Sequence, residues 1–342
     1  MIALPRTLIR ETLVKRRLVG LLLVLGLLLV TVGLSIAVGS RTIPLGDVLG
    51  ALNGTGRPDD VLTVRELRIP RTILGLVAGA ALGLAGALMQ SLTRNPLADP
   101  GIFGINHGAA AGVVLAITIF GITSPAGYVW FAFAGAVLAT LVAYGASSGR
   151  GGTNPARLAL AGIAVQFALA GVNQALQLAD RGALDQMRFW IVGSLANRET
   201  GTMWKLAPFF AAGILLSLLL ARSLNALALG DDTARALGAG VATTRILALV
   251  AVTLLCGAAT AACGPLAFIG LMVPHIVRTF TGPDQRWVLP FSMLLAPVVL
   301  LGADILGRVL SRPGELQVGI VMDVIGGIVF IAIVRARRVV HL

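Results

Sequence analysis

The chain has 342 residues, of which 57% are hydrophobic and 12% are charged, and its formal net charge is +12. A soluble domain is usually about a quarter charged, so this composition excludes an ordinary soluble globular protein. Apolar runs near the roughly 18-residue spanning threshold recur along the chain, without the period-two alternation of a transmembrane β-barrel. The sequence therefore predicts an all-α, polytopic helical bundle in a membrane.

The first apolar run, Leu18–Val38, follows a basic N-terminal stretch. It is too long for the hydrophobic region of a signal peptide, which has about 7–15 residues, and no small-residue cleavage site closes it. We interpret it as the first membrane span, with the N-terminus on the cytoplasmic side.

Basic residues gather in five clusters along the chain. These are the N-terminus, Arg150/Arg157, Arg222–Arg245, Arg278/Arg286 and Arg335–Arg338. Placing all five in the cytoplasm satisfies the positive-inside rule, makes both termini cytoplasmic and requires an even number of spans. No basic stripe with interleaved aromatic residues occurs, so nucleic acid is not an expected partner.

Hydropathy predicts about ten transmembrane helices in one domain over residues 1–342, because no linker divides the chain. The expected spans are Leu18–Val38, Arg71–Leu92, Gly104–Ile122, Tyr128–Ser148, Leu158–Leu178, Leu206–Ala221, Ile246–Ala262, Phe268–Phe280, Val288–Leu306 and Val318–Val334. Phe268–Phe280 is short for a span, and Pro265 and Pro274 interrupt this part of the chain, so we expect a broken or buried helix there.

Two features flank and fill the second span. Before it, Pro44 precedes an apolar stretch that predicts a short helix at the membrane interface. Within it, Gly75, Gly79 and Gly83 repeat at close spacing, with Gly86 on a neighbouring face. Such small residues let helix backbones approach, and we favour tight packing inside one bundle over a dimerisation face.

The segment after the second span is polar and contains Asn95, Pro96 and Asp99. Irregular backbone at membrane depth survives only when it is buried in protein or lines a cavity. We therefore count these residues, together with Asn106, as candidates that line or gate a pathway. A plain cytoplasmic turn is the equal alternative.

The stretch LGDDTARALG, Leu229–Gly238, lies between two apolar runs. Asp231 is the expected N-cap, Asp232 and Arg235 suit the two ends of the helix dipole, and Gly238 is the expected stop. Ala234, Leu237 and Val241 predict a short apolar face. Such a helix fits another protein's groove, whereas an ordinary capped loop helix is the alternative.

Catalytic motifs are missing from the sequence. Neither lysine, Lys15 or Lys205, stands in a Walker A motif, and no HExxH, GxSxG or CxxC motif occurs. We therefore expect no catalytic residue and no metal site, and the chain is not expected to be an enzyme. An intramembrane enzyme remains as an alternative without a motif behind it.

Several strings together resemble the FecCD-type permeases, the membrane subunits of type II ABC importers for iron-siderophores, haem and vitamin B12. They run in family order through nearly the whole chain: Arg68–Ala109 (RIPRTILGLVAGAALGLAGALMQSLTRNPLADPGIFGINHGA), RLALAG, WIVGSL, LGDDTARALG, GPLAFIGLMVPHIVR, ADILGR and ELQVGIV. Each string alone is weak, whereas their joint occurrence is specific.

The resemblance implies a ten-span subunit, like the permease of the vitamin B12 importer, in the bacterial cytoplasmic (inner) membrane. It implies pairing with a second permease subunit, two ATP-binding subunits that use ATP and Mg, and a periplasmic or lipid-anchored binding protein. This chain itself would bind no cofactor. The coupling helix that enters the ATPase would comprise Gly230, Asp231, Asp232, Ala234, Arg235, Leu237 and Gly238.

The resemblance also assigns three arginines to the outer surface. Arg68, Arg71 and Arg308 match external arginines that receive acidic residues of the binding protein. Our topology places them externally as well, against the positive-inside preference, and a guanidinium fork that pairs with carboxylates gives a reason for them. Interfacial snorkelling is the alternative.

The last span departs from the family pattern at Gln317, Met322-Asp323 and Ile328. An ionisable group inside a span is costly and usually functional. We expect Asp323 either to contact a polar or cationic substrate group or to pair with Arg308 or Asn106.

The resemblance favours an iron(III)-siderophore complex as cargo. Haem and cobalamin are alternatives within the family, and a secondary transporter or channel without an ATPase is the alternative from another class.

Overall fold

The computed structural model describes residues 6–147, 155–196 and 200–335, and regular structure within these ranges is entirely helical. Of the predicted basic clusters, Arg150, Arg337 and Arg338 lie outside the described residues. The elements are α1 (Arg6–Ala37), α2 (Leu45–Leu52), α3 (Pro58–Leu62), the π-helical turn η1 (Thr63–Arg68), α4 (Ile69–Thr93), the 3-10 turn η2 (Pro100–Phe103), α5 (Ile105–Thr118), α6 (Pro125–Ser147), α7 (Pro155–Ala179), α8 (Arg181–Ile191), α9 (Thr200–Leu219), α10 (Ala221–Ala228), α11 (Asp231–Ala236), α12 (Val241–Cys263), α13 (Ile269–Thr281), α14 (Gln285–Leu310) and α15 (Val318–Arg335).

Each of the ten expected spans coincides with a helix: α1, α4, α5, α6, α7, α9, α12, α13, α14 and α15. Seven helical segments of the described chain are long and apolar enough to cross a membrane, and α5 and α15 are shorter apolar helices. The predicted all-α membrane bundle is therefore confirmed. The expected short helix after Pro44 is α2.

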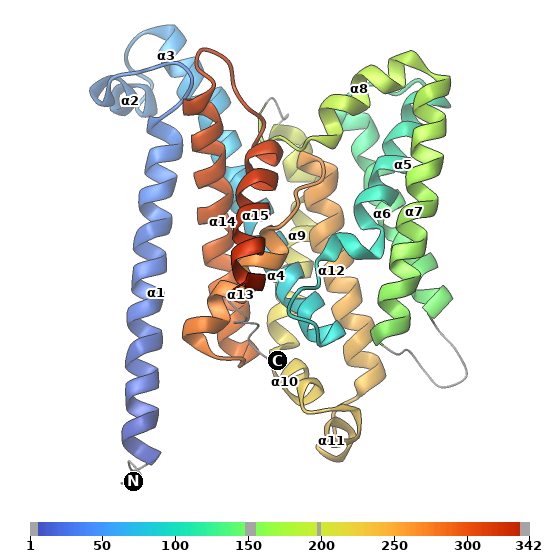
Figure 1. Cartoon of the computed structure of the whole chain (residues 1–342). Coiled ribbons are helices and arrows are strands. Elements are labelled where there is room, and N and C mark those ends of the chain that lie inside the picture. The colour runs from blue at the N-terminus through green and yellow to red at the C-terminus, as the bar shows by residue number, and fades with distance from the viewer. Residues whose placement is uncertain (1–5, 148–154, 197–199, 336–342) are drawn as a thin grey trace.

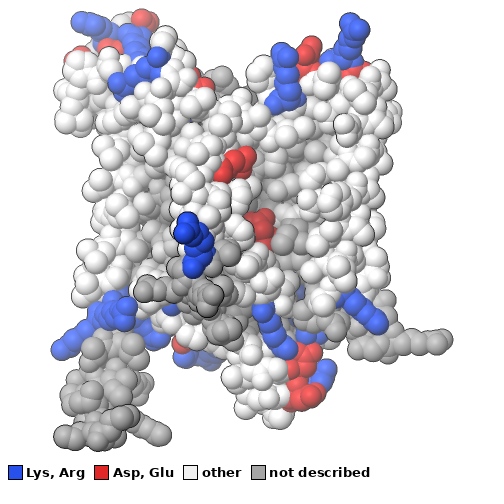
Figure 2. All heavy atoms as spheres, in the orientation of Figure 1, with Lys and Arg blue, Asp and Glu red and all other residues white. Residues whose placement is uncertain are grey.

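The bundle has two distinct ends. Helices α2, α3 and α8 lie at one end, the α2 end, and α11 lies at the opposite end, the α11 end, on the same side as the N-terminal part of α1 (Figure 1). On the face seen in Figure 2, most charged side chains gather at these two ends and the band between them is largely uncharged. This distribution is that of a bundle surrounded by lipid.

Helix α4 forms the centre of the bundle and packs against α12, α13 and α14. Its glycines allow this packing. A Cβ added at Gly79 would lie 2.6 Å from the Cα of Pro297 in α14, and one at Gly86 would lie 1.9 Å from the carbonyl oxygen of Gly270 in α13. The glycines therefore hold helices of one chain together, as expected, by close approach of backbones.

Helices α5 and α13 are short because each follows an irregular segment inside the bundle. At 1.5 Å per residue, the 13 residues of α13 span about 20 Å, less than the roughly 30 Å hydrocarbon layer. The contact between Gly86 and Gly270 places its start against α4. The predicted broken helix is thus confirmed, and the irregular segment between α12 and α13 is packed within the protein.

Candidate functional site

Helix α11 projects from the bundle at the α11 end (Figure 1). It begins after Gly230, whose φ of 106° makes it the N-cap, and Gly238, with φ 79°, ends the turn that follows it. The predicted glycine stop is therefore confirmed. The predicted cap is wrong: no side chain caps the helix, and Asp231 is its first residue.

The Asp231 carboxylate is instead held by two arginines, and we call Asp231, Arg94 and Arg245 the Asp231 cluster. Arg245 of α12 donates from Nη2 to both carboxylate oxygens, at 3.0 and 2.9 Å. Arg94, which follows α4, donates from Nη2 to Oδ1 at 2.5 Å and to the carbonyl of Leu227 at 2.8 Å. The cluster therefore ties α11 to α4, α10 and α12.

The outer surface of α11 carries a second, separate ion pair. The side chain of Asp232 is fully exposed and accepts from Arg235 at 2.8 Å, one helical turn away. Of the predicted apolar face, Ala234 is buried against the bundle and Val241 is also buried, whereas Leu237 is 65% exposed. The prediction that these three residues share one apolar face is thus wrong. Ala234 and Val241 are buried, whereas the side chain of Leu237 is exposed and available for contact with another molecule.

Two arginines and two carboxylates form a network at the α2 end, which we call the arginine–carboxylate network (Arg71, Asp304, Arg308 and Glu315). Arg71 of α4 donates from Nε and Nη2 to Asp304 of α14 at 2.7–3.1 Å, and from Nη1 to Glu315 at 2.5 Å. Arg308 pairs with the same Asp304 at 2.9 Å. The Asp304 side chain is completely buried between the two guanidinium groups.

Arg68 and Arg308 also bind backbone carbonyls near the end of α1. Arg68 donates to the carbonyls of Ile36, Ala37 and Arg41, and Arg308 donates to those of Ser35 and Val38. Arg68 is 4% exposed and Arg308 is 1% exposed. Their donors hold α1, η1 and α14 together, and the docking role of these two arginines stays a prediction.

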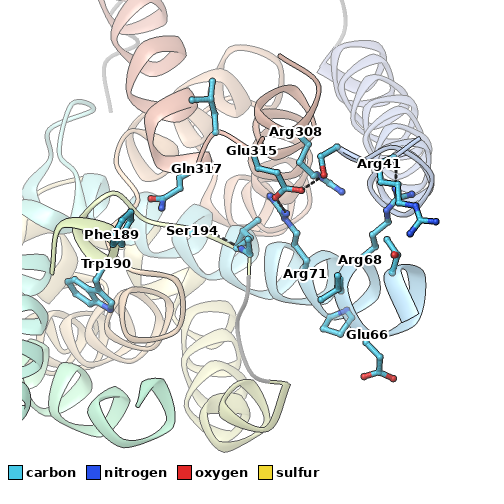
Figure 3. Close-up of a pocket in the computed structure, with 18 of the residues that line it drawn as sticks. Arg41, Glu66, Arg68, Arg71, Phe189, Trp190, Ser194, Arg308, Glu315 and Gln317 are labelled. Atoms are coloured by element: carbon cyan, nitrogen blue, oxygen red, sulfur yellow. Dashed lines mark hydrogen bonds and ion pairs between the residues drawn. The ribbon is translucent and has the colours of Figure 1, made fainter. Parts of the chain in front are cut away.

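A cavity of about 720 Å³ opens beside the network. Figure 3 shows Arg71, Arg308 and Glu315 pointing toward one another on one side of it, and Phe189 and Trp190 on the other. All three predicted docking arginines, Arg68, Arg71 and Arg308, line this cavity. Burial acts to raise the pKa of Glu315, but the hydrogen bond and the charge of Arg71 outweigh it and hold that pKa below its ordinary value of 4.5.

The pathway candidates after α4 lie in the segment between Arg94 and α5. The side chains of Asn95 and Asp99 bind backbone N–H groups two residues further on, those of Leu97 and Gly101, and Pro96 lies in the first of these turns. Asn106, in the first turn of α5, accepts from Thr260 of α12 at 2.9 Å. The structure thus brings Asn106 against α12, and the gating role of these residues stays a prediction.

Asp323 lies on the exposed side of α15. Arg308 is occupied by Asp304 and Asn106 is bound by Thr260, so the expected pairing of Asp323 with either of them is wrong. The alternative, contact with a substrate group, stays a prediction.

Sequence reasoning missed Asp304, Arg94 and Arg245. The sequence could have predicted a role for Asp304, because it is an acidic residue inside an apolar span. It also stands four residues before Arg308, about one helical turn away, where an ion pair can form. The sequence around Arg94 and Arg245 did not identify their partner, since 137 and 14 residues separate them from Asp231.

The sequence matches a known protein family and several of its characterised members over most of its length. The sequence model of the FecCD transport family matches residues 27–336. The ferric enterobactin transport system permease protein FepD of Escherichia coli (strain K12) is 49% identical over 320 residues, which cover 93% of this chain and 94% of that protein. The Fe(3+)-citrate import system permease protein YfmD of Bacillus subtilis (strain 168) is 39% identical, covering 94% and 96% of the two chains.

The fold has a counterpart among solved structures. A structure described as an inward-facing conformation of a metal-chelate type ABC transporter superposes with a TM-score of 0.82 and 26% sequence identity. The match covers 93% of this chain and 99% of that chain. The sequence comparison and the structural comparison therefore both match this chain to ABC-transporter permeases over nearly its whole length.

Proposed function

The chain belongs to the FecCD transport family, whose members are permease subunits of ABC importers, and from that premise we propose that its cargo is a ferric siderophore. The observation that carries this proposal is the 49% identity, sustained over 320 residues, with a permease for ferric enterobactin. The identity with the ferric citrate permease is lower, at 39%. Ferric enterobactin is therefore the first cargo to test, before haem and cobalamin.

The proposed assembly contains two permease subunits, two ATP-binding subunits and a binding protein that delivers the chelate. ATP and Mg act at the ATP-binding subunits, and no cofactor is assigned to this chain. The proposed location is the bacterial inner membrane, with the α11 end in the cytoplasm. The basic clusters around α11 support that orientation through the positive-inside rule.

Helix α11 is the proposed coupling helix. It projects from the bundle (Figure 1), and Leu237 at its end is 65% exposed. An apolar side chain exposed on a short helix suits a groove in a partner protein. Closure of the ATP-binding subunits would move two such helices and rock the two bundles between outward- and inward-facing states.

The binding protein is proposed to dock at the α2 end. Arg68, Arg71 and Arg308 already bind acceptors within the chain, so acidic groups of a binding protein would have to enter the cavity that these arginines line. Docking through them is therefore proposed as an exchange of acceptors rather than as contact with free guanidinium groups.

Uptake by a deletion strain tests the cargo. Cells that lack this gene are complemented with it and given radiolabelled ferric enterobactin, ferric citrate, haem or cobalamin in separate assays. We expect restored uptake of ferric enterobactin, and we expect this uptake to be abolished when the partner ATPase carries a Walker A Lys→Ala substitution. Restored uptake of haem or cobalamin alone would replace the proposed cargo, and uptake that ignores the ATPase substitution would indicate a secondary transporter.

A substitution on α11 tests the proposed ATPase contact. Leu237→Glu places a charge on the exposed apolar contact, so we expect loss of ATPase co-purification and of uptake, with normal insertion into the membrane. The matched control is Leu49→Glu on α2, where the leucine is 57% exposed at the opposite end. Normal ATPase co-purification of Leu237→Glu would contradict the assignment of the coupling helix.

A further inference from the structure

The Asp231 cluster joins two stretches of the chain that are far apart in sequence. Asp231 is the first residue of α11, and Arg94 is the C-cap residue directly after α4. Their side chains meet at 2.5 Å, across 137 residues. The side chain of Arg245 is 12% exposed and that of Asp231 is 27% exposed, so solvent weakens this pair less than it weakens a surface pair. Arg94 is the more exposed partner, at 34%, and its bond to Asp231 is open to solvent.

Arg94 stands where the backbone changes direction. Its φ of 49° lies in the left-handed region, which side chains other than glycine rarely adopt. The N–H of the next residue, Asn95, still bonds back to Gln90 of α4, and the segment then leaves the helix. A force on the Arg94 guanidinium therefore acts at the junction between α4 and the segment Asn95–Gly104.

That segment is packed against three other helices. A Cβ added at Gly104 would lie 3.1 Å from Cγ1 of Val165 in α7, and one at Gly270 of α13 would lie 2.9 Å from Cδ of Pro100. Directly after the segment, Asn106 is bound by Thr260 of α12. A displacement of the segment would therefore be passed to α7, α12 and α13 through these contacts, because packed interiors transmit strain rather than absorb it.

We propose that the Asp231 cluster is the link through which movement of α11 reaches the segment Asn95–Gly104, with Asp231 and Arg94 as positioning residues for transport. This inference rests on the proposed function, since it needs an ATPase that moves α11. The link has a second anchor, because Arg94 also binds the carbonyl of Leu227 in α10. Arg245 completes it by fixing the same carboxylate to α12.

The test measures cargo moved per ATP hydrolysed. The complete importer, with permease, ATPase and binding protein, is reconstituted in proteoliposomes with radiolabelled ferric enterobactin as the probe. Asp231→Asn removes the charge that holds both arginines. Asp232→Asn is the matched comparison, because it makes the same change on the next residue but breaks only the exposed pair with Arg235.

We expect the ratio of cargo to ATP to fall at least about fivefold in Asp231→Asn, the lower end of typical coupling effects. In Asp232→Asn we expect a smaller fall, because this variant also changes the proposed coupling helix but leaves both bonds of the Asp231 cluster in place. Asp231→Glu keeps the carboxylate and should recover part of the ratio. Equal ratios in Asp231→Asn and Asp232→Asn would overturn the inference, because any general effect of charge on α11 is common to both.

Arg94→Gln keeps the test decisive if Asp231→Asn does not assemble with the ATPase. This variant leaves α11 and its bond to Arg245 in place and removes the bonds from the end of α4 to Asp231 and to the carbonyl of Leu227 in α10. The same fall in the ratio supports the link, and a wild-type ratio overturns it. If the wild-type importer moves no ferric enterobactin with ATP, the proposed cargo fails instead, so the two failures are distinguishable.

Discussion

Asp304 is the residue on which the α2 end depends. It is completely buried and pairs with Arg71 and Arg308, while Arg68 lies beside them. One carboxylate therefore compensates two buried guanidinium groups, and the remaining donors are satisfied by Glu315 and by carbonyls at the end of α1. The burial of several charges is tolerable here because each has its partner.

Removing that carboxylate should be costly. Asp304→Asn leaves two arginines buried without their shared counter-charge, and we expect a loss of about 3–5 kcal/mol in unfolding free energy. A lower melting temperature of the purified protein in detergent would report it. Asp59→Asn is the control, because Asp59 is 80% exposed and 3.7 Å from Arg41, and its loss should change the melting temperature little. Equal melting temperatures for the two variants would contradict the assignment.

Glu315 should make the stability of the α2 end depend on pH. Its pKa in the folded protein lies below the ordinary 4.5, so its ion pair with Arg71 stabilises fully above about pH 4.5 and is lost as the pH falls through the folded pKa. The wild type should therefore melt higher than Glu315→Gln at about pH 6, with a smaller difference at about pH 3.5. A difference that does not change between these pH values would exclude Glu315 as its source.

The sequence predicts which residues are unusual better than it predicts their partners. Arg68, Arg71 and Arg308 were recognised as basic groups on the wrong side for the positive-inside rule, and Asp231 as an acid at a helix start. The pairings were not predictable, because a carboxylate such as Asp231 can satisfy a helix N-terminus locally or an arginine 137 residues away equally well. The tertiary packing of α11 against the end of α4 determines that Asp231 binds Arg94.

At the scale of elements, α4 shows how sequence pattern becomes packing. Its glycines at Gly75, Gly79 and Gly83 face α14, and Gly86 faces α13. Without a hydrophobic drive between helices in lipid, close backbone contact supplies dispersion energy instead. The spacing of small residues therefore predicts the face correctly, although it could not identify the partner helices.

Gly86→Ala tests this packing. The added Cβ would lie 1.9 Å from the carbonyl oxygen of Gly270, which is backbone and cannot rotate away, so α4 and α13 must separate. Overpacking of this kind costs about 1–3 kcal/mol, and we expect a lower melting temperature in detergent. Gly33→Ala on α1 is the control, because its Cβ would have no neighbour within 4 Å. An unchanged melting temperature of Gly86→Ala would show that the helices are not in this contact.

The seven segments of the described chain that are long and apolar enough to cross a membrane, and the shorter apolar helices α5 and α15, were predictable because lipid demands a continuous apolar run. Helices α3, α8 and α10 were not predicted, since they have 5, 11 and 8 residues and carry polar faces at the ends of the bundle. The broken helix α13 was anticipated from Pro274 and its shortness. The position of α13 in the bundle depends on its contacts with α4, such as the one between Gly86 and Gly270, and these contacts could not be predicted from the sequence.

At the scale of the whole molecule, the two ends have different chemistry. The α2 end holds the arginine–carboxylate network and the cavity beside it, and the α11 end holds the Asp231 cluster and the exposed Leu237. Chains of packed helices, α4 above all, connect the two ends. An importer needs this division, because one end must receive cargo while the other receives the movement that ATP drives.

That division predicts which side of the membrane each end occupies. Arg57, before α3, and Arg235, in α11, are both exposed and lie at opposite ends. In right-side-out spheroplasts, a membrane-impermeant maleimide should label Arg57→Cys at once, and Arg235→Cys only after permeabilisation, because the proposed orientation places the basic α11 end in the cytoplasm. The chain without an introduced cysteine is the control and should remain unlabelled, because Cys256 and Cys263 are both buried. Labelling of Arg235→Cys in intact spheroplasts would reverse the orientation, and an ATPase in the cytoplasm could not then reach α11.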